Sequence, residues 1–176
     1  MYNPLQDPLF IVMLLLRYAH ILGAMTLFGA TVFMRFALAP SAESLPADAH
    51  AKLKDDVRAK WAKFVHLSIL LLLVSGVTNM ALASRFKFGA GEVNYGMLYN
   101  MLVGVKLLLA LPIFFIASVL AGRSEGTKKF RANAPFWMNI NIALAIVMVL
   151  MGGFLRFVPR QLKGEPPAAV RAETTP

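Results

Sequence analysis

Four long apolar stretches constrain this chain more than any other feature of its sequence. They lie at about residues 9–37, 61–83, 97–121 and 136–157, and each exceeds the ~20 helical residues that cross a ~30 Å hydrocarbon core. Hydrophobic residues make up 58% of the chain and charged residues 15%, with a mean hydropathy of +0.63. The sequence therefore predicts an all-α fold, an integral membrane four-helix transmembrane bundle, with one transmembrane domain over residues 1–158.

The segments outside these stretches collect most of the Pro, Gly and charge. The N-terminus lacks a basic region and a small-residue cleavage site, so the first stretch is expected to be a retained helix and not a signal peptide. Residues 40–60 have a polar helical pattern, which we expect to lie on the membrane surface. The polar tail at 159–176 has too few apolar residues to fold and is predicted to be disordered.

The net charge of +9 is better explained by membrane topology than by a nucleic-acid partner, which we do not expect. The first and third loops carry more basic residues than the other side, and the positive-inside rule then assigns these loops to the cytoplasm and both termini to the outer, periplasmic side. The chain is thus predicted to be a multi-pass protein of a bacterial-type plasma (inner) membrane. The first and third loops with their flanks contain Arg35, Lys52, Lys54, Arg58, Lys60, Lys63, Arg123, Lys128, Lys129 and Arg131, and the opposite side contains Arg85, Lys87, Arg156, Arg160, Lys163 and Arg171.

Two ionisable residues are predicted deep inside the apolar stretches. A rise of about 1.5 Å per residue puts His20 ~16 Å and Lys106 ~14 Å from the same membrane face, so the two should be level near the midplane. Ionisable residues at this depth are costly and mark functional sites by default. We therefore predict that His20 and Lys106 carry the chemistry.

The depths of the histidines bear on a possible haem. His66 should lie ~7 Å from the opposite face, in the neighbourhood of Asn139, which leaves it offset by roughly 7 Å from His20. Two axial ligands of one iron should be nearly level, so His20 pairs better with Lys106, although a bis-histidine site with His66 remains an alternative. Arg17 and Arg156 lie towards the outer face, where their guanidinium groups could pair with two propionates.

Three motifs resemble one known family. RYAHILGAMTLFGATVFMRF, with Arg35 fifteen positions after the His, LVGVKLLLA around Lys106, and FRANAP at residues 130–135 are similar to segments of the HemJ-type protoporphyrinogen oxidases. The membrane domain of copper-resistance protein D shares the same four-helix plan. The resemblance covers most of residues 12–157.

The resemblance implies that the first-span His and the third-span Lys are the functional pair and are associated with haem b, which assigns these roles to His20 and Lys106. The chain departs from the pattern where Leu27 replaces a Trp and Ala134 replaces an acidic residue. A His expected later on the third helix is also absent, whereas His66 is additional. The predicted site has His20 and Lys106 as catalytic residues, His20 and His66 as metal ligands, and a cofactor-binding set of His20, His66, Lys106, Arg17, Arg35, Asn139 and Arg156.

Several functions fit these residues. The leading prediction is a redox protein that transfers electrons to or from a quinone or a partner protein, or that oxidises a porphyrinogen. Copper handling is an alternative, because thioethers suit Cu(I) and two methionine pairs, Met97 with Met101 and Met148 with Met151, have helical spacing. A third hypothesis is a non-catalytic accessory subunit, or a homo-oligomer, packed through small-residue faces. The predicted spans contain no Asp or Glu, which argues against hydrolytic or proton-pumping carboxylate chemistry.

Overall fold

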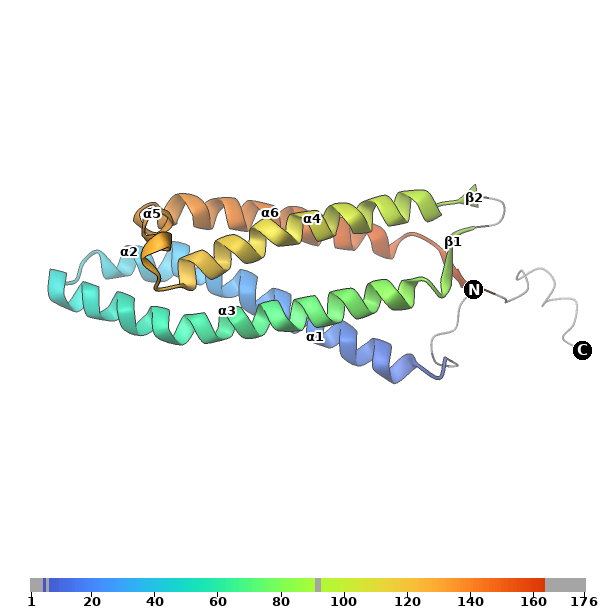
Figure 1. The fold of residues 1–176 in the computed structure, drawn as a ribbon, viewed down its shortest axis with the longest axis horizontal. Coiled ribbons are helices and arrows are strands. Elements are labelled where there is room, and N and C mark those ends of the chain that lie inside the picture. The colour runs from blue at the N-terminus through green and yellow to red at the C-terminus, as the bar shows by residue number, and fades with distance from the viewer. Residues whose placement is uncertain (1–4, 6, 91–92, 164–176) are drawn as a thin grey trace, which may run out of the picture.

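The structure is a computed structural model that describes residues 5, 7–90 and 93–163. Four long helices run antiparallel side by side, with two helix connections at one end and a small sheet at the other (Figure 1). Each is long and apolar enough to cross a membrane, which confirms the predicted all-α, four-helix transmembrane bundle. The four helical spans are Phe10–Ala42, Ala47–Ala83, Gly96–Ala121 and Ala134–Arg156.

The first span is a composite helix. Helix α1 covers Phe10–Phe33, a π-helical turn η2 covers Met34–Leu38, and α2 covers Ala39–Ala42. Pro40 has no backbone N–H and its ring crowds the carbonyl four residues earlier, and the Ala39 N–H donates to the carbonyl of Met34, five residues back. The proline thus explains why the helix widens here instead of ending near residue 37 as the sequence predicted.

The second span is longer than predicted. Helix α3 runs without a break over Ala47–Ala83, so its 37 residues extend ~55 Å against a ~30 Å hydrocarbon core. Residues 47–60, the larger part of the polar segment that we expected on the membrane surface, are therefore a straight extension of α3, which reaches beyond its neighbours at that end (Figure 1). Residues 47–60 contain neither Gly nor Pro and are rich in Ala and Lys, which favour helix continuation.

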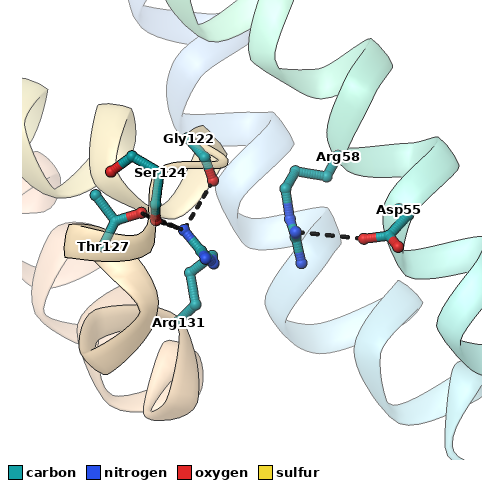
Figure 2. Close-up of polar contacts among 6 residues, drawn as sticks. All are labelled: Asp55, Arg58, Gly122, Ser124, Thr127 and Arg131. Carbon is teal, nitrogen blue, oxygen red and sulfur yellow. Dashed lines mark hydrogen bonds and ion pairs between the residues drawn. The ribbon is translucent and has the colours of Figure 1, made fainter.

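Helices α4 (Gly96–Ala121) and α6 (Ala134–Arg156) complete the bundle. They are joined by a 3₁₀ turn, η3 (Glu125–Thr127), and a short helix, α5 (Lys128–Ala132). The Arg131 guanidinium holds this connection together, because its Nη1 donates to the carbonyls of Gly122 at 3.1 Å and Ser124 at 2.9 Å and also to the Thr127 hydroxyl (Figure 2). Nearby on α3, Arg58 forms an ion pair of 3.3 Å with Asp55 (Figure 2).

The opposite end carries a small sheet that the sequence did not predict. Strand β1 (Phe86–Ala90) pairs antiparallel with both β2 (Val93–Asn94) and β3 (Arg160–Leu162), in the order β2-β1-β3. Strand β3 corrects the prediction that disorder begins at residue 159, because its pairing with β1 supplies backbone hydrogen bonds that the short polar sequence alone does not reveal. Residues 164–176 lie outside the described residues.

Both described ends of the chain meet at this sheet. Asp7 is buried, caps the Leu9 N–H at 2.8 Å and forms an ion pair of 3.2 Å with Arg85, which immediately precedes β1. The described residues that precede α1 and those that follow α6 therefore lie at the same end of the bundle, as an even number of spans requires.

The tightest packing lies in the half of the bundle nearer the helix connections. The buried core is made by side chains from all four helices, and none of them belongs to the half that adjoins the sheet. Its members are Leu27, Trp61, Val65, Ile113, Ile116, Ala117, Leu120, Ala121 and Met138. The two cavities described below are lined by residues of the sheet half.

Candidate functional site

His20 lies on α1 against α3, where a single hydroxyl fixes its ring. The His20 Nδ1 is 2.8 Å from the Oγ of Ser75, and that hydroxyl donates its hydrogen to the carbonyl of Leu71 at 2.5 Å, with the carbonyl of Leu72 at 3.4 Å as the other acceptor. Since a serine hydroxyl has one hydrogen, its oxygen faces the ring as an acceptor and Nδ1 carries the proton. The neutral ring then exposes an Nε2 lone pair, the form in which histidine binds a metal.

The other ring nitrogen of His20, Nε2, has no hydrogen-bond partner among the residues that the structure describes. The ring is half-buried, and its Cε1 packs over Gly76, where an added methyl group would lie 3.7 Å from it. Ser75 and Gly76 thus orient the imidazole together, one by a hydrogen bond and the other by its small size.

Lys106 lies on α4 at the same level as His20. Its Nζ sits beside Gly152 of α6, where a methyl group would approach it to 3.2 Å. The level of Lys106 can be compared with that of His20 by counting residues from a bond that joins the first span to α6. The Arg35 Nε on the first span donates to Asn139 Oδ1 on α6 at 3.0 Å, so these two residues lie at one level. His20 is 15 residues from Arg35 and Gly152 is 13 residues from Asn139, which correspond to about 22 and 20 Å along the two helices.

This agreement within about 3 Å matches the level that the sequence predicted for His20 and Lys106. Lys106 is half-buried and has no hydrogen bond or ion pair with any other described residue. An unpaired ammonium at membrane depth is expensive. The site therefore combines a nitrogen lone pair with an unpaired positive charge and has chemistry to offer an anionic or metal-containing ligand.

A cavity of about 380 Å³ lies between the level of these two residues and the sheet, and neither His20 nor Lys106 is among its described lining residues. Arg17, one turn before His20, lines it from α1, and Asn79, one turn after Ser75, lines it from α3. Arg156 and Gly152 line it from α6. The remaining lining residues are Phe10, Met13, Leu14, Leu82, Ala83, Phe86, Phe88, Tyr99, Leu155 and Val158.

The cavity has an apolar wall, a cationic rim and no carboxylate among the lining residues that the structure describes. Its volume falls in the ~300–1,000 Å³ range of small-molecule sites. Arg17 and Arg156, which the sequence predicted as a pair towards the outer face, both belong to its lining. The structure thus brings four predicted site residues to one region, namely His20, Lys106, Arg17 and Arg156.

The other predicted site residues lie elsewhere. His66 is exposed on α3, and its Nδ1 donates to the Ala62 carbonyl of its own helix at 2.6 Å. It precedes Ser75 by nine residues, which puts it about 14 Å along the helix from His20. Arg35 and Asn139 bind each other at the level of the π-helical turn. None of these three residues lines the cavity.

Sequence reasoning missed Ser75, Gly76, Asn79 and Gly152. A signal for the first three is present in SGVTN at 75–79, a polar and small-residue cluster within an otherwise apolar span. Gly152 had no such signal, because its significance depends on which lysine packs against it.

The methionine pairs are not buried together in a pocket. Met97 is 86% exposed and Met101 57% exposed on α4, while Met148 packs beside the buried core. Within the described residues there is also no cluster of three or more His, Cys, Asp or Glu side chains that could hold a metal ion. A metal at His20 would therefore need most of its ligands from a prosthetic group.

Comparison of the chain with protein-family models, with curated proteins and with solved structures found no match.

Proposed function

We propose that this protein is an integral membrane redox protein that binds haem b, or a related porphyrin, in the cavity beside His20 and Lys106. The observation that carries the proposal is the hydrogen-bond chain from His20 through Ser75 to the α3 backbone. It leaves the Nε2 lone pair as the reactive position of the ring. A porphyrin would bring most of the ligands of its metal, so a single histidine would suffice, and the described residues hold no cluster of metal-binding side chains.

The residues around the cavity suit such a group. Its apolar side chains would pack on the macrocycle, and the Arg17 and Arg156 guanidinium groups would pair with the two propionates through bidentate hydrogen bonds. When bound, the group would supply one-electron redox chemistry, with a potential set by its ligands and surroundings. Ser75 would hold the ligand tautomer, as outer-shell partners of metal-bound histidines do.

Lys106 is the residue whose role would differ between an enzyme that oxidises a porphyrinogen and a simple electron carrier. Its ammonium has three donors and no partner in the described part of the chain, so it could donate to a carboxylate or hold a proton beside the macrocycle. This fits the family resemblance, in which the oxidation of a porphyrinogen involves the corresponding Lys. Electron transfer to or from a quinone or a partner protein needs only the redox group and its exposed edge.

The test is the visible spectrum of the protein purified from cells supplied with haem. We expect a haem absorption band that His20→Ala abolishes and that His66→Ala leaves unchanged, because His66 is about 14 Å along the helix from the His20 level. A colourless parent protein, or a band that survives in His20→Ala, would refute the assignment. Comparable thermal unfolding of both variants serves as the folding control.

We also propose a bacterial-type plasma membrane, with the two helix connections in the cytoplasm and the sheet outside. The excess of basic residues at the connections supports this orientation. The chain has no cysteine, so a single Ser44→Cys in the exposed first connection can be labelled selectively. A membrane-impermeant maleimide should label it only after the cells are opened, and labelling of intact cells would reverse the orientation.

A further inference from the structure

A second and larger cavity lies on the other side of an aromatic stack. The rings of Phe88 on β1 and Tyr99 on α4 are stacked with their centroids 3.5 Å apart and an interplanar angle of 11°, and both residues line both cavities. The second cavity, of about 650 Å³, opens between the end of α3 and the start of α4. Its lining residues are Met80, Ala83, Ser84, Phe86, Lys87, Phe88, Gly89, Asn94, Gly96, Tyr99, Asn100, Val103 and Lys163.

Two lysines give this cavity a positive charge that no described residue of its lining neutralises. Lys87 is on β1 and Lys163 follows β3, and both are exposed. The sheet brings them together, because Lys87 is in register with Gln161 and the Lys163 N–H donates to the Arg85 carbonyl at 3.0 Å. The described lining residues include no Asp or Glu, so their electrostatics favour an anion.

The position of the cavity relative to the spans indicates which chemical class of anion it would bind. Met80 and Val103 are in the last turn of α3 and the second turn of α4, inside the apolar spans, whereas both lysines are in the sheet region beyond the helix ends. The cavity therefore has an apolar wall towards the hydrocarbon and two lysine side chains at the membrane boundary. Asn100, also exposed in the lining, adds an amide that can donate hydrogen bonds at the same level.

We propose that this cavity binds the phosphate headgroup and the upper acyl chains of an anionic phospholipid, taken from the leaflet at the sheet end. Lys87 and Lys163 contact the phosphate, and Met80 and Val103 contact the chains. The Phe88–Tyr99 stack separates this lipid from the cavity beside His20. The proposal is independent of whether that first cavity binds haem.

The experiment uses the full chain with p-benzoylphenylalanine in place of Asn100, reconstituted in vesicles of phosphatidylcholine with a minor fraction of phosphatidylglycerol. Photocrosslinked lipids are identified by mass spectrometry, and the ratio of the two lipids is compared with their ratio in the vesicle. We expect phosphatidylglycerol to be enriched. Since each basic residue near a membrane surface contributes ~1 kcal/mol, we expect the enrichment to fall about fivefold for each of Lys87→Gln and Lys163→Gln.

Two controls keep the outcome specific. Lys52→Gln with Lys54→Gln removes two positive charges from exposed positions at the other end of the bundle and should leave the enrichment unchanged. The same crosslinker at Leu111, exposed on α4 away from the cavity, should report the bulk lipid ratio.

Three results would overturn the proposal. Equal capture of both lipids at position 100, or no capture of either, would exclude a phospholipid site. Enrichment that persists without the two lysines would exclude their role in it. Displacement of the lipid by excess inorganic phosphate alone would reassign the cavity to a free anion.

Discussion

Replacing Gly23 with alanine tests the close contact between α1 and α3 that holds His20 in position. A methyl group at Gly23 would lie 3.1 Å from Leu72 Cγ, 3.1 Å from the Ser68 carbonyl oxygen and 3.2 Å from Leu71 Cβ. Each distance is shorter than the ~3.5–4.0 Å of ordinary carbon contacts. Two of the three atoms belong to the backbone or to the base of a side chain, so α1 must move away from α3.

The size of the effect follows from a matched control on the same helix. At Gly29 an added methyl group meets nothing within 4 Å, so Gly29→Ala measures only the gain in helix propensity, up to ~1 kcal/mol. Overpacking costs ~1–3 kcal/mol. Because both variants share the propensity gain, Gly23→Ala should be ~1–3 kcal/mol less stable than Gly29→Ala.

The assay is reversible unfolding in mixed micelles on titration with a denaturing detergent, followed by tryptophan fluorescence. Gly29→Ala should unfold at the same or a higher detergent fraction than the parent, and Gly23→Ala at a lower one. Equal stabilities of the two alanine variants would mean that α1 and α3 do not approach as closely as the contacts at Gly23 require.

Two further predictions concern the protein loaded with haem. Ser75→Ala removes the acceptor of the His20 Nδ1–H and should weaken haem binding about 10- to 100-fold, as loss of outer-shell partners does. The control, Thr78→Ala, removes a hydroxyl that bonds only its own helix and should leave the haem affinity unchanged. Equal affinities of the two variants, titrated at the main haem band, would contradict the tautomer argument. Gly152→Ala displaces the Lys106 ammonium, which a methyl group would approach to 3.2 Å, while Gly153→Ala meets nothing within 4 Å. If Lys106 donates a charge-assisted hydrogen bond to the haem, worth ~1.5–3 kcal/mol, Gly152→Ala should weaken binding about tenfold or more, and unchanged affinity would remove Lys106 from the site.

The level of His20 and Lys106 could be predicted because it depends only on counting residues along two helices. The start of each apolar stretch fixed the position of one membrane boundary, and the helical rise per residue then gave the depth of each side chain. The same arithmetic failed to give the surroundings of His66, because depth does not specify which way a side chain points around the helix. In the structure His66 bonds its own backbone and faces outward.

The cavity and the sheet could not be predicted because they depend on contacts distant in sequence. Strand β3 forms only by pairing with β1, across more than the whole of α4 and α6, and no alternating pattern marks three residues as a strand. The pairing of Gly152 with Lys106 and of Ser75 with His20 similarly depends on which helices become neighbours. Interhelical contacts of this kind are not encoded in the periodicity of any one span.

Because the buried core and the proposed site lie in different halves of the bundle, residues of the site can be substituted without removing side chains from the core. The buried core, from Leu27 to Met138, lies entirely on the far side of the His20 and Lys106 level from the sheet. Stability varies locally with the density of buried contacts, so changes beside the cavity should leave most of the packed core intact. A His20→Ala protein should therefore still insert and fold, which means that loss of its spectrum would report loss of a ligand and not loss of the bundle.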